Sequence, residues 1–370
     1  MTRMILLNPG PANTTDTVKR AMTRPDICPR EREFGDVLRR VRDGVTRVVH
    51  AGNVFTAVLL GGSGTAAVEA AIASAVPGDG RLLVVDNGAY GARMHAIARA
   101  YGIACDALSL GVGGYPDPTR IRDALGAHRY THLAVVHHET STGMLNPVEA
   151  IGAACREHGA EMIVDAMSSY AGIPIDIERL GADFLVSSAN KCIQGMAGLA
   201  FVICRRERLA RMAPIPGRSH YLALGRQHAF FEAQGQMEFT PPVQVAYALE
   251  QALAEYFAEG ADARFQRYMS NWEALDGGMR ELGFRRLLPE AMLSRILTAY
   301  LEPDHPSYGF DAMHDRLYDK GFTIYPGKGA HRATFRLANM GDVRTDDMRA
   351  FVRAMREVLD EMNVSPLYSS

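Results

Sequence analysis

The chain has 370 residues, with 40 basic and 42 acidic side chains and a formal net charge of −2. Because 47% of the residues are hydrophobic and 22% are charged, the chain can bury a large core, which excludes a disordered or collagen-like protein. The near-neutral balance gives no electrostatic reason to expect nucleic acid or a membrane surface as a partner.

Short β-branched runs alternate with helical patterns through the first two thirds of the sequence, which is typical of βαβ units on a mostly parallel sheet. Strands are predicted near 55–60, 81–86, 104–109, 132–137, 161–165, 183–187 and 198–204. Helices are predicted near 64–76, 89–101, 117–127 and 147–158. The last two strands are too close for a crossover helix, so we expect a locally antiparallel pair joined by a functional loop.

The last third of the chain has a different pattern. Residues 212–240 are rich in Pro, Gly, Gln and His and lack clear periodicity, which predicts a long surface or interface segment. A long connecting helix is expected from 243 to about 284. A smaller α+β unit follows, with strands near 293–300, 322–325 and 333–337 and a closing helix near 345–361.

The cysteines and the first residues bear on the cellular location. The five cysteines are scattered and show no zinc-binding spacing, so neither a disulfide framework nor a metal site is expected. The first apolar run is too short for a signal peptide, and no run is long enough for a membrane span. These observations predict a cytoplasmic protein.

Lysine is scarce, and Lys191 is the only one between positions 20 and 319. It follows the strand predicted at 183–187 and lies among small polar residues. An ordinary solvated lysine is the commoner interpretation. The sequence on either side is apolar, however, and a partly desolvated lysine has a lowered pKa that suits Schiff-base chemistry.

Two further segments are predicted at the same edge of the sheet. Ser63, Gly64 and Thr65 follow a strand and open an Ala-rich helix, which favours a phosphate cradle and equally favours a tight turn with an N-cap hydroxyl. Asp165 ends a strand at the edge where ligands of open α/β sheets bind. Its carboxylate could pair with a cationic heterocycle or cap the next turn.

An amine, a carboxylate and an anion cradle are together what pyridoxal 5'-phosphate requires. Tyr90 lies just past a predicted strand, where its ring could stack on the pyridine face or pack on the core. The residues therefore predict a pyridoxal phosphate site built around Lys191.

The chain resembles the class V aminotransferases of fold type I from about residue 5 to about residue 360. The segments that carry the resemblance occur in this order: Asn8-Pro9-Gly10-Pro11, Gly61-Gly62-Ser63-Gly64-Thr65, Asn87-Gly88-Ala89-Tyr90-Gly91-Ala92-Arg93, Glu139-Thr140-Ser141-Thr142-Gly143, Asp165-Ala166-Met167-Ser168-Ser169 and Ser188-Ala189-Asn190-Lys191-Cys192. Within the family the pattern is most similar to enzymes that transfer the amino group of 2-aminoethylphosphonate to pyruvate. Such enzymes give phosphonoacetaldehyde and L-alanine by a ping-pong mechanism.

The resemblance also implies an architecture. It implies an α/β fold of three parts: an N-terminal segment, 1–14, near the active site; a large cofactor-binding domain, 15–255, with a mostly parallel mixed sheet between helices; and a small α+β C-terminal domain, 256–370. It further implies a homodimer whose active sites lie at the subunit interface.

Roles for individual residues follow from the same resemblance. Lys191 would hold the cofactor and move protons, Asp165 would pair with the pyridine nitrogen, and Tyr90 would stack on the ring. Thr140 would hydrogen-bond the ring near its phenolic oxygen. The phosphate would be bound by Ser63, Gly64 and Thr65, joined by Thr240 from the second subunit.

Substrate choice would depend on Arg336, whose planar fork can pair with a carboxylate or a phosphonate. The backbone of Gly10 and Pro11 would lie near the substrate. Segments 26–34 and 214–236 depart from the pattern of phosphonate transaminases, which leaves open an alanine–glyoxylate or serine–pyruvate type aminotransferase. Two alternatives belong to other functional classes. A nucleotide-binding oxidoreductase would fit a parallel α/β sheet with a Gly-rich turn, but the sequence lacks the GxGxxG motif. A non-catalytic binding protein would require a vestigial cofactor site.

Overall fold

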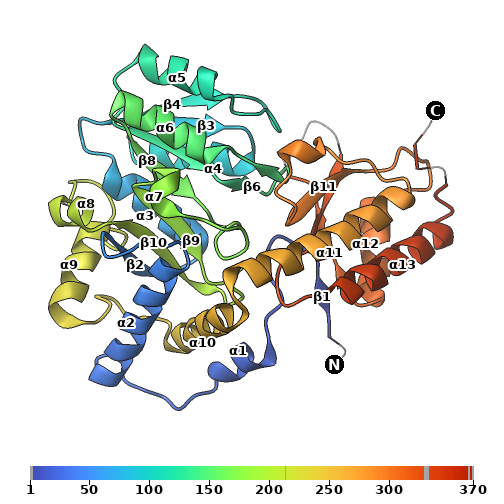
Figure 1. Ribbon diagram of the computed structural model, residues 1–370, viewed down its shortest axis with the longest axis horizontal. Helices are drawn as coiled ribbons and strands as arrows, with labels where there is room; N and C mark the ends of the chain where they lie inside the picture. The colour runs from blue at the N-terminus through green and yellow to red at the C-terminus, as the bar shows by residue number, and fades with distance from the viewer. Residues whose placement is uncertain (1–2, 213, 329–332, 366, 369–370) are drawn as a thin grey trace.

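The computed structural model describes residues 3–212, 214–328, 333–365 and 367–368. Figure 1 shows a larger α/β part and a smaller part that contains the C-terminus, with a long helix running between them. None of the helices among the described residues is both long enough and apolar enough to cross a membrane.

The larger part is built on a seven-stranded sheet in the order β2-β10-β9-β8-β5-β3-β4. Its strands are β2 (Phe55–Gly62), β3 (Arg81–Asp86), β4 (Ala104–Ser109), β5 (His132–Val136), β8 (Glu161–Asp165), β9 (Phe184–Ser188) and β10 (Gly198–Arg205). Only β10 is antiparallel to its neighbours, β2 and β9. The predicted strands, and the predicted antiparallel pair before and after Lys191, are therefore confirmed.

Helices cover both faces of this sheet, which explains why its strands read as continuous apolar runs. One face packs against α2 (Arg32–Arg47), α5 (Pro118–Ala127), α6 (Val148–His158) and α10 (Val243–Glu259). The other face packs against α3 (Gly64–Ala75) and α4 (Ala89–Ala100). Successive residues of β3 alternate between the two cores, with Leu83 and Val85 in the first and Leu82 and Val84 in the second.

One prediction for the middle of the chain is wrong. The single helix expected over 243–284 is two helices, α10 and α11 (Ala261–Glu281), because Gly260 adopts a φ of +87° between them. The segment 212–240, predicted to be a long surface or interface segment, follows α8 (Arg206–Arg211) and contains α9 (Leu224–Gln234), while position 213 lies outside the described residues. The buried face of α9 includes Gln227, which interrupts the apolar pattern that would have revealed a helix.

The smaller part holds an antiparallel sheet in the order β11-β14-β13. Its strands are β11 (Leu297–Leu301), β14 (Thr334–Ala338) and β13 (Tyr325–Pro326), packed with α11, α12 (Phe310–Asp319) and α13 (Thr345–Glu361). The first strand begins later than the predicted 293–300 because Arg295 has a φ of +59°, which interrupts the extended backbone before Leu297. The predicted strand 322–325 splits into β12 (Phe322–Thr323) and β13, which pair with different strands.

The N-terminal segment joins the smaller part. Strand β1 (Ile5–Leu6) pairs in parallel with β12, and the carbonyl of Leu7 accepts a hydrogen bond from the amide of Ala338 in β14 at 2.8 Å. After Leu7 the chain crosses to the larger part, where the amide of Ala12 donates to the carbonyl of Asn190 at 3.1 Å. The segment therefore bridges the two parts beside Lys191.

Candidate active site

A cavity of about 560 Å³ lies at the carboxyl edge of the seven-stranded sheet. Residues from three strand ends and two helix starts line it, because parallel strands deliver their last residues to one edge. It brings together most of the residues predicted to hold the cofactor: Ser63, Gly64, Thr65, Tyr90, Asp165 and Lys191.

Lys191 lies just after β9, and its side chain is held by the N-terminal segment. Its Nζ donates a hydrogen bond to the carbonyl oxygen of Pro9 at 2.8 Å. A Cβ on Gly10, which has a φ of +126°, would lie 2.4 Å from that Nζ, so glycine is required for the close approach. Burial lowers the pKa of Lys191, while the charge of Asp165 opposes this effect. Lys191 is therefore half-buried, with its amine hydrogen-bonded to the N-terminal segment.

Asp165 ends β8 and is buried at 5% exposure. One carboxylate oxygen accepts the amide of Met167 at 2.9 Å, so the turn-capping contact expected as an alternative is present. No described cationic side chain forms an ion pair with Asp165. Burial raises the pKa of Asp165 to about 6, and the nearby charge of Glu139 adds to this rise. The carboxylate is therefore poised to gain from a cation placed in the cavity.

The loop before α3 is not a simple capped turn. Ser63 occupies the N-cap position with extended backbone, but its side chain makes no capping hydrogen bond. A Cβ on Gly64 would lie 2.3 Å from the sulfur of Met167. The hydroxyl of Thr65 accepts a hydrogen bond from Arg93 at 3.1 Å. An uncapped helix start with an arginine beside it is suited to an anion.

Tyr90 lies in the first turn of α4 and is surrounded by cations. The guanidinium carbon of Arg93 is 4.9 Å from the centroid of its ring, and Nζ of Lys328 is 5.1 Å from the same centroid. Tyr90 also raises the pKa of Arg336, which burial lowers overall. The ring therefore lies between the predicted phosphate loop and the predicted substrate arginine.

Arg336 is buried in β14 and reaches toward the larger part. Its Nε donates to the carbonyl of Pro326 at 3.0 Å, and its Nη1 donates to the carbonyl of Thr140 at 3.3 Å. Thr140 itself is buried next to β6 (His138–Glu139). These two residues are brought beside the cavity without lining it. Thr240 is exposed and does not line the cavity of its own chain.

Glu139 was not singled out from the sequence, although its carboxylate connects the start of α4 to the segment that follows β6. Its buried carboxylate accepts the amides of Tyr90 and Gly91 at 3.1 and 3.2 Å and the amide of Ser141 at 3.1 Å. Burial raises the pKa of Glu139. In the sequence Glu139 lies in a polar run, His137 to Gly143, where nothing distinguishes it from a surface acid. Arg93 was not singled out for a different reason: it is one of 36 arginines, and no spacing distinguishes it.

The adjacent histidines, His137 and His138, hold neighbouring loops. Nδ1 of His138 lies 3.0 Å from the hydroxyl of Ser168, and its Nε2 lies 2.8 Å from the hydroxyl of Ser294. His137 lies 3.0 Å from the hydroxyl of Ser169 through Nδ1. Burial lowers the pKa of His137 to about 4 and that of His138 to about 3, so both rings are neutral at physiological pH.

Comparison with known proteins places this geometry in a family. Residues 17–305 match the model for the family described as Aminotransferase class-V. The chain is 47% identical over 360 residues to a 2-aminoethylphosphonate–pyruvate transaminase of Syntrophobacter fumaroxidans, with 96% of each chain covered. It is 42% identical to a protein of the same name from Vibrio vulnificus, with 96% of this chain and 97% of the relative covered.

Solved structures agree with this assignment. An alanine–glyoxylate aminotransferase from Nostoc sp. superposes with a TM-score of 0.90 at 28% identity, covering 97% of this chain and 96% of the other. A pyridoxamine–pyruvate aminotransferase from Mesorhizobium loti superposes with a TM-score of 0.88 at 26% identity, covering 98% and 93%. The chain therefore belongs to the class V aminotransferases of fold type I, which are pyridoxal-phosphate-dependent enzymes.

Proposed function

We propose that this aminotransferase moves the amino group of 2-aminoethylphosphonate to pyruvate, giving phosphonoacetaldehyde and L-alanine by a ping-pong mechanism. The observation that carries the proposal is a cavity in which an amine, a carboxylate and an uncapped helix start meet beside a buried arginine. The names of the relatives from Syntrophobacter and Vibrio support the choice of donor and acceptor.

Pyridoxal 5'-phosphate fits the cavity by its chemistry. Ser63, Gly64 and Thr65, with Arg93, offer donors to a phosphate at the start of α3. Asp165 offers a buried carboxylate to a protonated ring nitrogen, and Lys191 offers an amine. When bound, the cofactor supplies an electron sink for the carbon that carries the substrate amine.

Lys191 would be the covalent attachment point and the proton carrier. Burial lowers the pKa of its amine, so a larger fraction is neutral and nucleophilic than for a solvated lysine. The carbonyl of Pro9 holds Nζ in a fixed position. From there, Nζ would remove a proton from the amine-bearing carbon of the donor and deliver one to the acceptor.

Asp165 and Tyr90 would hold the ring. A cation on the ring nitrogen would offset the desolvation that raises the pKa of Asp165, so the carboxylate would stay ionised and the nitrogen protonated. Glu139 fixes Tyr90 through its backbone amide, which would keep the phenol ring against the pyridine face. Thr140 would hydrogen-bond near the phenolic oxygen.

Arg336 would bind the anionic end of both substrates. Its guanidinium is already held by the carbonyls of Pro326 and Thr140, so little side-chain freedom is lost on binding. A phosphonate and a carboxylate can each accept two of its N–H donors. The backbone of Gly10 and Pro11 lies beside Lys191, where it would limit the space for the substrate.

The assembly and the division into domains belong to the same proposal. Exposed Thr240 would complete the phosphate site of a partner subunit in a homodimer. We place the division at Gly260 rather than at residue 255, which lies inside α10, because α10 packs against α1 (Asp16–Ala21) and α2 while α11 packs against α13. The N-terminal segment 1–14 would act between the two domains. Free cysteines support a cytoplasmic location.

A panel of amino donors tests the proposal. With pyruvate as acceptor, we expect 2-aminoethylphosphonate to have a kcat/KM at least tenfold above those of serine and alanine, measured by coupled assay of the keto product. Faster turnover with serine, or with alanine and glyoxylate, would replace the proposal with a serine–pyruvate or alanine–glyoxylate activity.

A further inference from the structure

Tyr268 lies in α11, the long helix between the larger and the smaller part, and its side chain is completely buried (Figure 1). It belongs to a small apolar cluster that draws on both parts, since Cys192 comes from the loop of Lys191 and Ala338 comes from β14. Tyr268 does not line the candidate active site. The cluster therefore joins the loop of the amine to the sheet that carries Arg336.

The hydroxyl of Tyr268 uses its full hydrogen-bonding capacity. It accepts Nε2 of Gln194 at 2.8 Å and the amide of Gly341 at 3.0 Å, and it donates to the carbonyl of Cys192 at 3.4 Å. Nη1 of Arg264, also on α11, donates to the same carbonyl at 3.1 Å. Burial raises the pKa of Tyr268, so the phenol keeps the proton that it donates. One oxygen atom thus connects two segments that are far apart in the sequence.

The first of these segments is the lysine loop, residues 189–197 between β9 and β10. The amide of Gln194 donates to the carbonyl of Lys191 at 2.9 Å, which closes a turn that begins at the lysine. Gln194 has a φ of +65°, a conformation that residues other than glycine seldom adopt and that persists only where contacts hold it. The side chain of Gln194 is held by Tyr268. Tyr268 therefore stabilises the turn that presents Lys191.

The second segment follows β14, the strand of Arg336. The amide of Gly341 donates to the hydroxyl of Tyr268, and its carbonyl accepts Nη1 of Arg267 at 2.8 Å. Nδ2 of Asn339 donates to the backbone carbonyl of Tyr268 at 2.8 Å. Helix α11 therefore fixes the chain just after the strand that carries the substrate arginine.

Lys191 and Arg336 act on the same molecule in the proposed function. Burial lowers the pKa of Lys191 and the charge of Arg336 lowers it further, so the amine and the guanidinium lie within electrostatic reach of each other. A substrate anchored at Arg336 must present its amine-bearing carbon to Nζ, and a misplacement of about 1 Å can slow a reaction about 100-fold.

We propose that Tyr268 is a positioning residue for transamination, whose hydroxyl fixes the lysine loop to the segment after β14 and so sets the amine of Lys191 relative to the guanidinium of Arg336. The inference rests on the proposed function, in which Lys191 moves protons and Arg336 binds the anionic end of the substrate. Tyr268 acts through these two residues and not on the substrate itself.

A double-mutant cycle with Tyr268→Phe and Arg336→Ala tests this role. The kcat of the cofactor-loaded enzyme is divided by the amount of cofactor that borohydride traps on the chain, so that loss of folded protein does not lower it. Tyr268→Phe alone is expected to lower kcat about tenfold and to change KM less than about twofold, because the substrate binds normally but reacts from a displaced position. In the Arg336→Ala enzyme, where the substrate is no longer anchored, Tyr268→Phe should lower kcat less than about twofold.

Two results of the cycle would overturn the proposal. An unchanged kcat in Tyr268→Phe would show that the hydroxyl is dispensable. An equal loss of kcat with and without Arg336 would show that Tyr268 supports the lysine loop alone.

Gln194→Gly is a second variant that keeps the turn, because glycine adopts a positive φ without strain. It removes one of the three hydrogen bonds of the Tyr268 hydroxyl, and we expect kcat to fall about threefold. This loss should also disappear in the Arg336→Ala enzyme. If Tyr268→Phe does not fold, Gln194→Gly decides the question, and a loss that persists without Arg336 would overturn the proposal.

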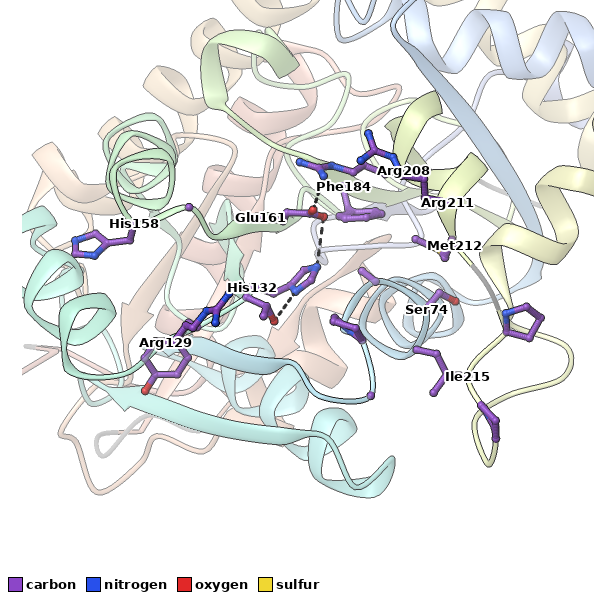
Figure 2. Close-up of a pocket in the computed structure, with 18 residues that line it drawn as sticks. Ser74, Arg129, His132, His158, Glu161, Phe184, Arg208, Arg211, Met212 and Ile215 are labelled. Atoms are coloured by element: carbon purple, nitrogen blue, oxygen red, sulfur yellow. Dashed lines mark hydrogen bonds and ion pairs between the residues drawn. The ribbon is translucent and has the colours of Figure 1, made fainter.

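Tyr130→Phe is the matched control, at the opposite edge of the seven-stranded sheet. Figure 2 shows a cavity at this amino edge, where β5 and β8 begin at His132 and Glu161, and Tyr130 lines that cavity. Tyr130 is buried, and its hydroxyl lies 2.8 Å from a carboxylate oxygen of Asp106. Its loss should leave kcat unchanged in both backgrounds. A fall equal to that of Tyr268→Phe would overturn the positioning role.

Alanine as a second amino donor separates this proposal from the proposed function. Alanine and 2-aminoethylphosphonate both offer an anionic group to Arg336. A higher kcat/KM with alanine would change the substrate and leave the cycle valid with alanine as donor. An unchanged turnover in Arg336→Ala alone would instead remove Arg336 from the site, and the positioning role of Tyr268 with it.

Discussion

The two edges of the central sheet differ in how their acidic side chains are paired. At the amino edge, Glu161 is paired with Arg208, and Asp183 lies 3.7 Å from Arg205. At the carboxyl edge, Asp165 has no cationic side chain at ion-pair distance among the described residues. Burial raises the pKa of Asp165, which favours the neutral form of its carboxyl group. Half-buried carboxylates are thus paired at the amino edge, while the buried carboxylate of Asp165 at the carboxyl edge is without a cation among the described residues, which keeps the carboxyl edge ready for a ligand.

The largest effect should come from removing the amine at the carboxyl edge. Lys191→Ala is expected to lower turnover by a factor on the order of 10⁴ or more, because covalent attachment and proton transfer depend on one group. Borohydride should then trap no cofactor on the chain, which mass spectrometry can check. Lys320→Ala is the control, since Lys320 forms surface ion pairs with Glu357 and Glu361. Retained turnover with a trapped adduct would remove Lys191 from the site.

Neutralising Asp165 should separate cofactor binding from apoprotein stability. The folded pKa of about 6 lies above the ordinary value near 3.8, so the apoprotein binds this proton more tightly than the unfolded chain does. Stability from this group is therefore present below pH 4 and is lost as the pH rises through 6. Asp165→Asn should stabilise the apoprotein by about 1–3 kcal/mol at pH 8, with little change at pH 4.

The same Asp165→Asn substitution should lower kcat about 100-fold in the holoenzyme, because the ring nitrogen loses its counterion. Denaturant unfolding of the apoprotein at the two pH values and steady-state kinetics measure the two effects. Asp86→Asn, at the end of β3, which β5 separates from β8, lies outside the cavity lining and should change neither. A destabilised Asp165→Asn apoprotein at pH 8 would show that the aspartate is a structural cap.

Breaking a pair at the amino edge should give the reverse pattern. Glu161→Gln leaves Arg208 and His132 without their carboxylate and is expected to cost about 1–2 kcal/mol of stability, with kcat and KM for transamination unchanged. Thermal unfolding of the holoenzyme measures the loss. Glu157→Gln, which breaks a fully surface pair with Arg122, should have a smaller effect. A fall in kcat would mean that the two edges are coupled.

The smallest effect concerns Lys328, whose exposed amine lies over the ring of Tyr90. A phosphonate carries more negative charge than a carboxylate, so we expect Lys328→Met to raise KM for 2-aminoethylphosphonate about threefold and to leave KM for pyruvate nearly unchanged. Initial-rate kinetics at low ionic strength measure the difference. Equal changes in both KM values would show that Lys328 does not distinguish the substrates.

Sequence patterns predicted the strands of the large sheet and the antiparallel pair before and after Lys191, because strands buried on both faces are continuous apolar runs with turn residues between them. They also predicted that Asp165, Lys191 and Ser63 meet, since parallel strands place their ends at one edge. They did not reveal Glu139, whose partners are backbone amides from another segment. Nor did they reveal the break at Gly260, because a helical pattern continues across a single glycine.

The path of the first residues has a consequence for handling this protein. Leu7 is bonded to the C-terminal sheet, Ala12 to the loop that carries Lys191, and Pro9 between them to the reactive amine. The N-terminal segment therefore connects the larger and the smaller part of the molecule and passes beside the candidate active site. Affinity tags or truncations near Ile5 should be judged by kinetics as well as by yield. If the N-terminal segment is displaced, the protein would still fold, but the amine of Lys191 would no longer be held in position.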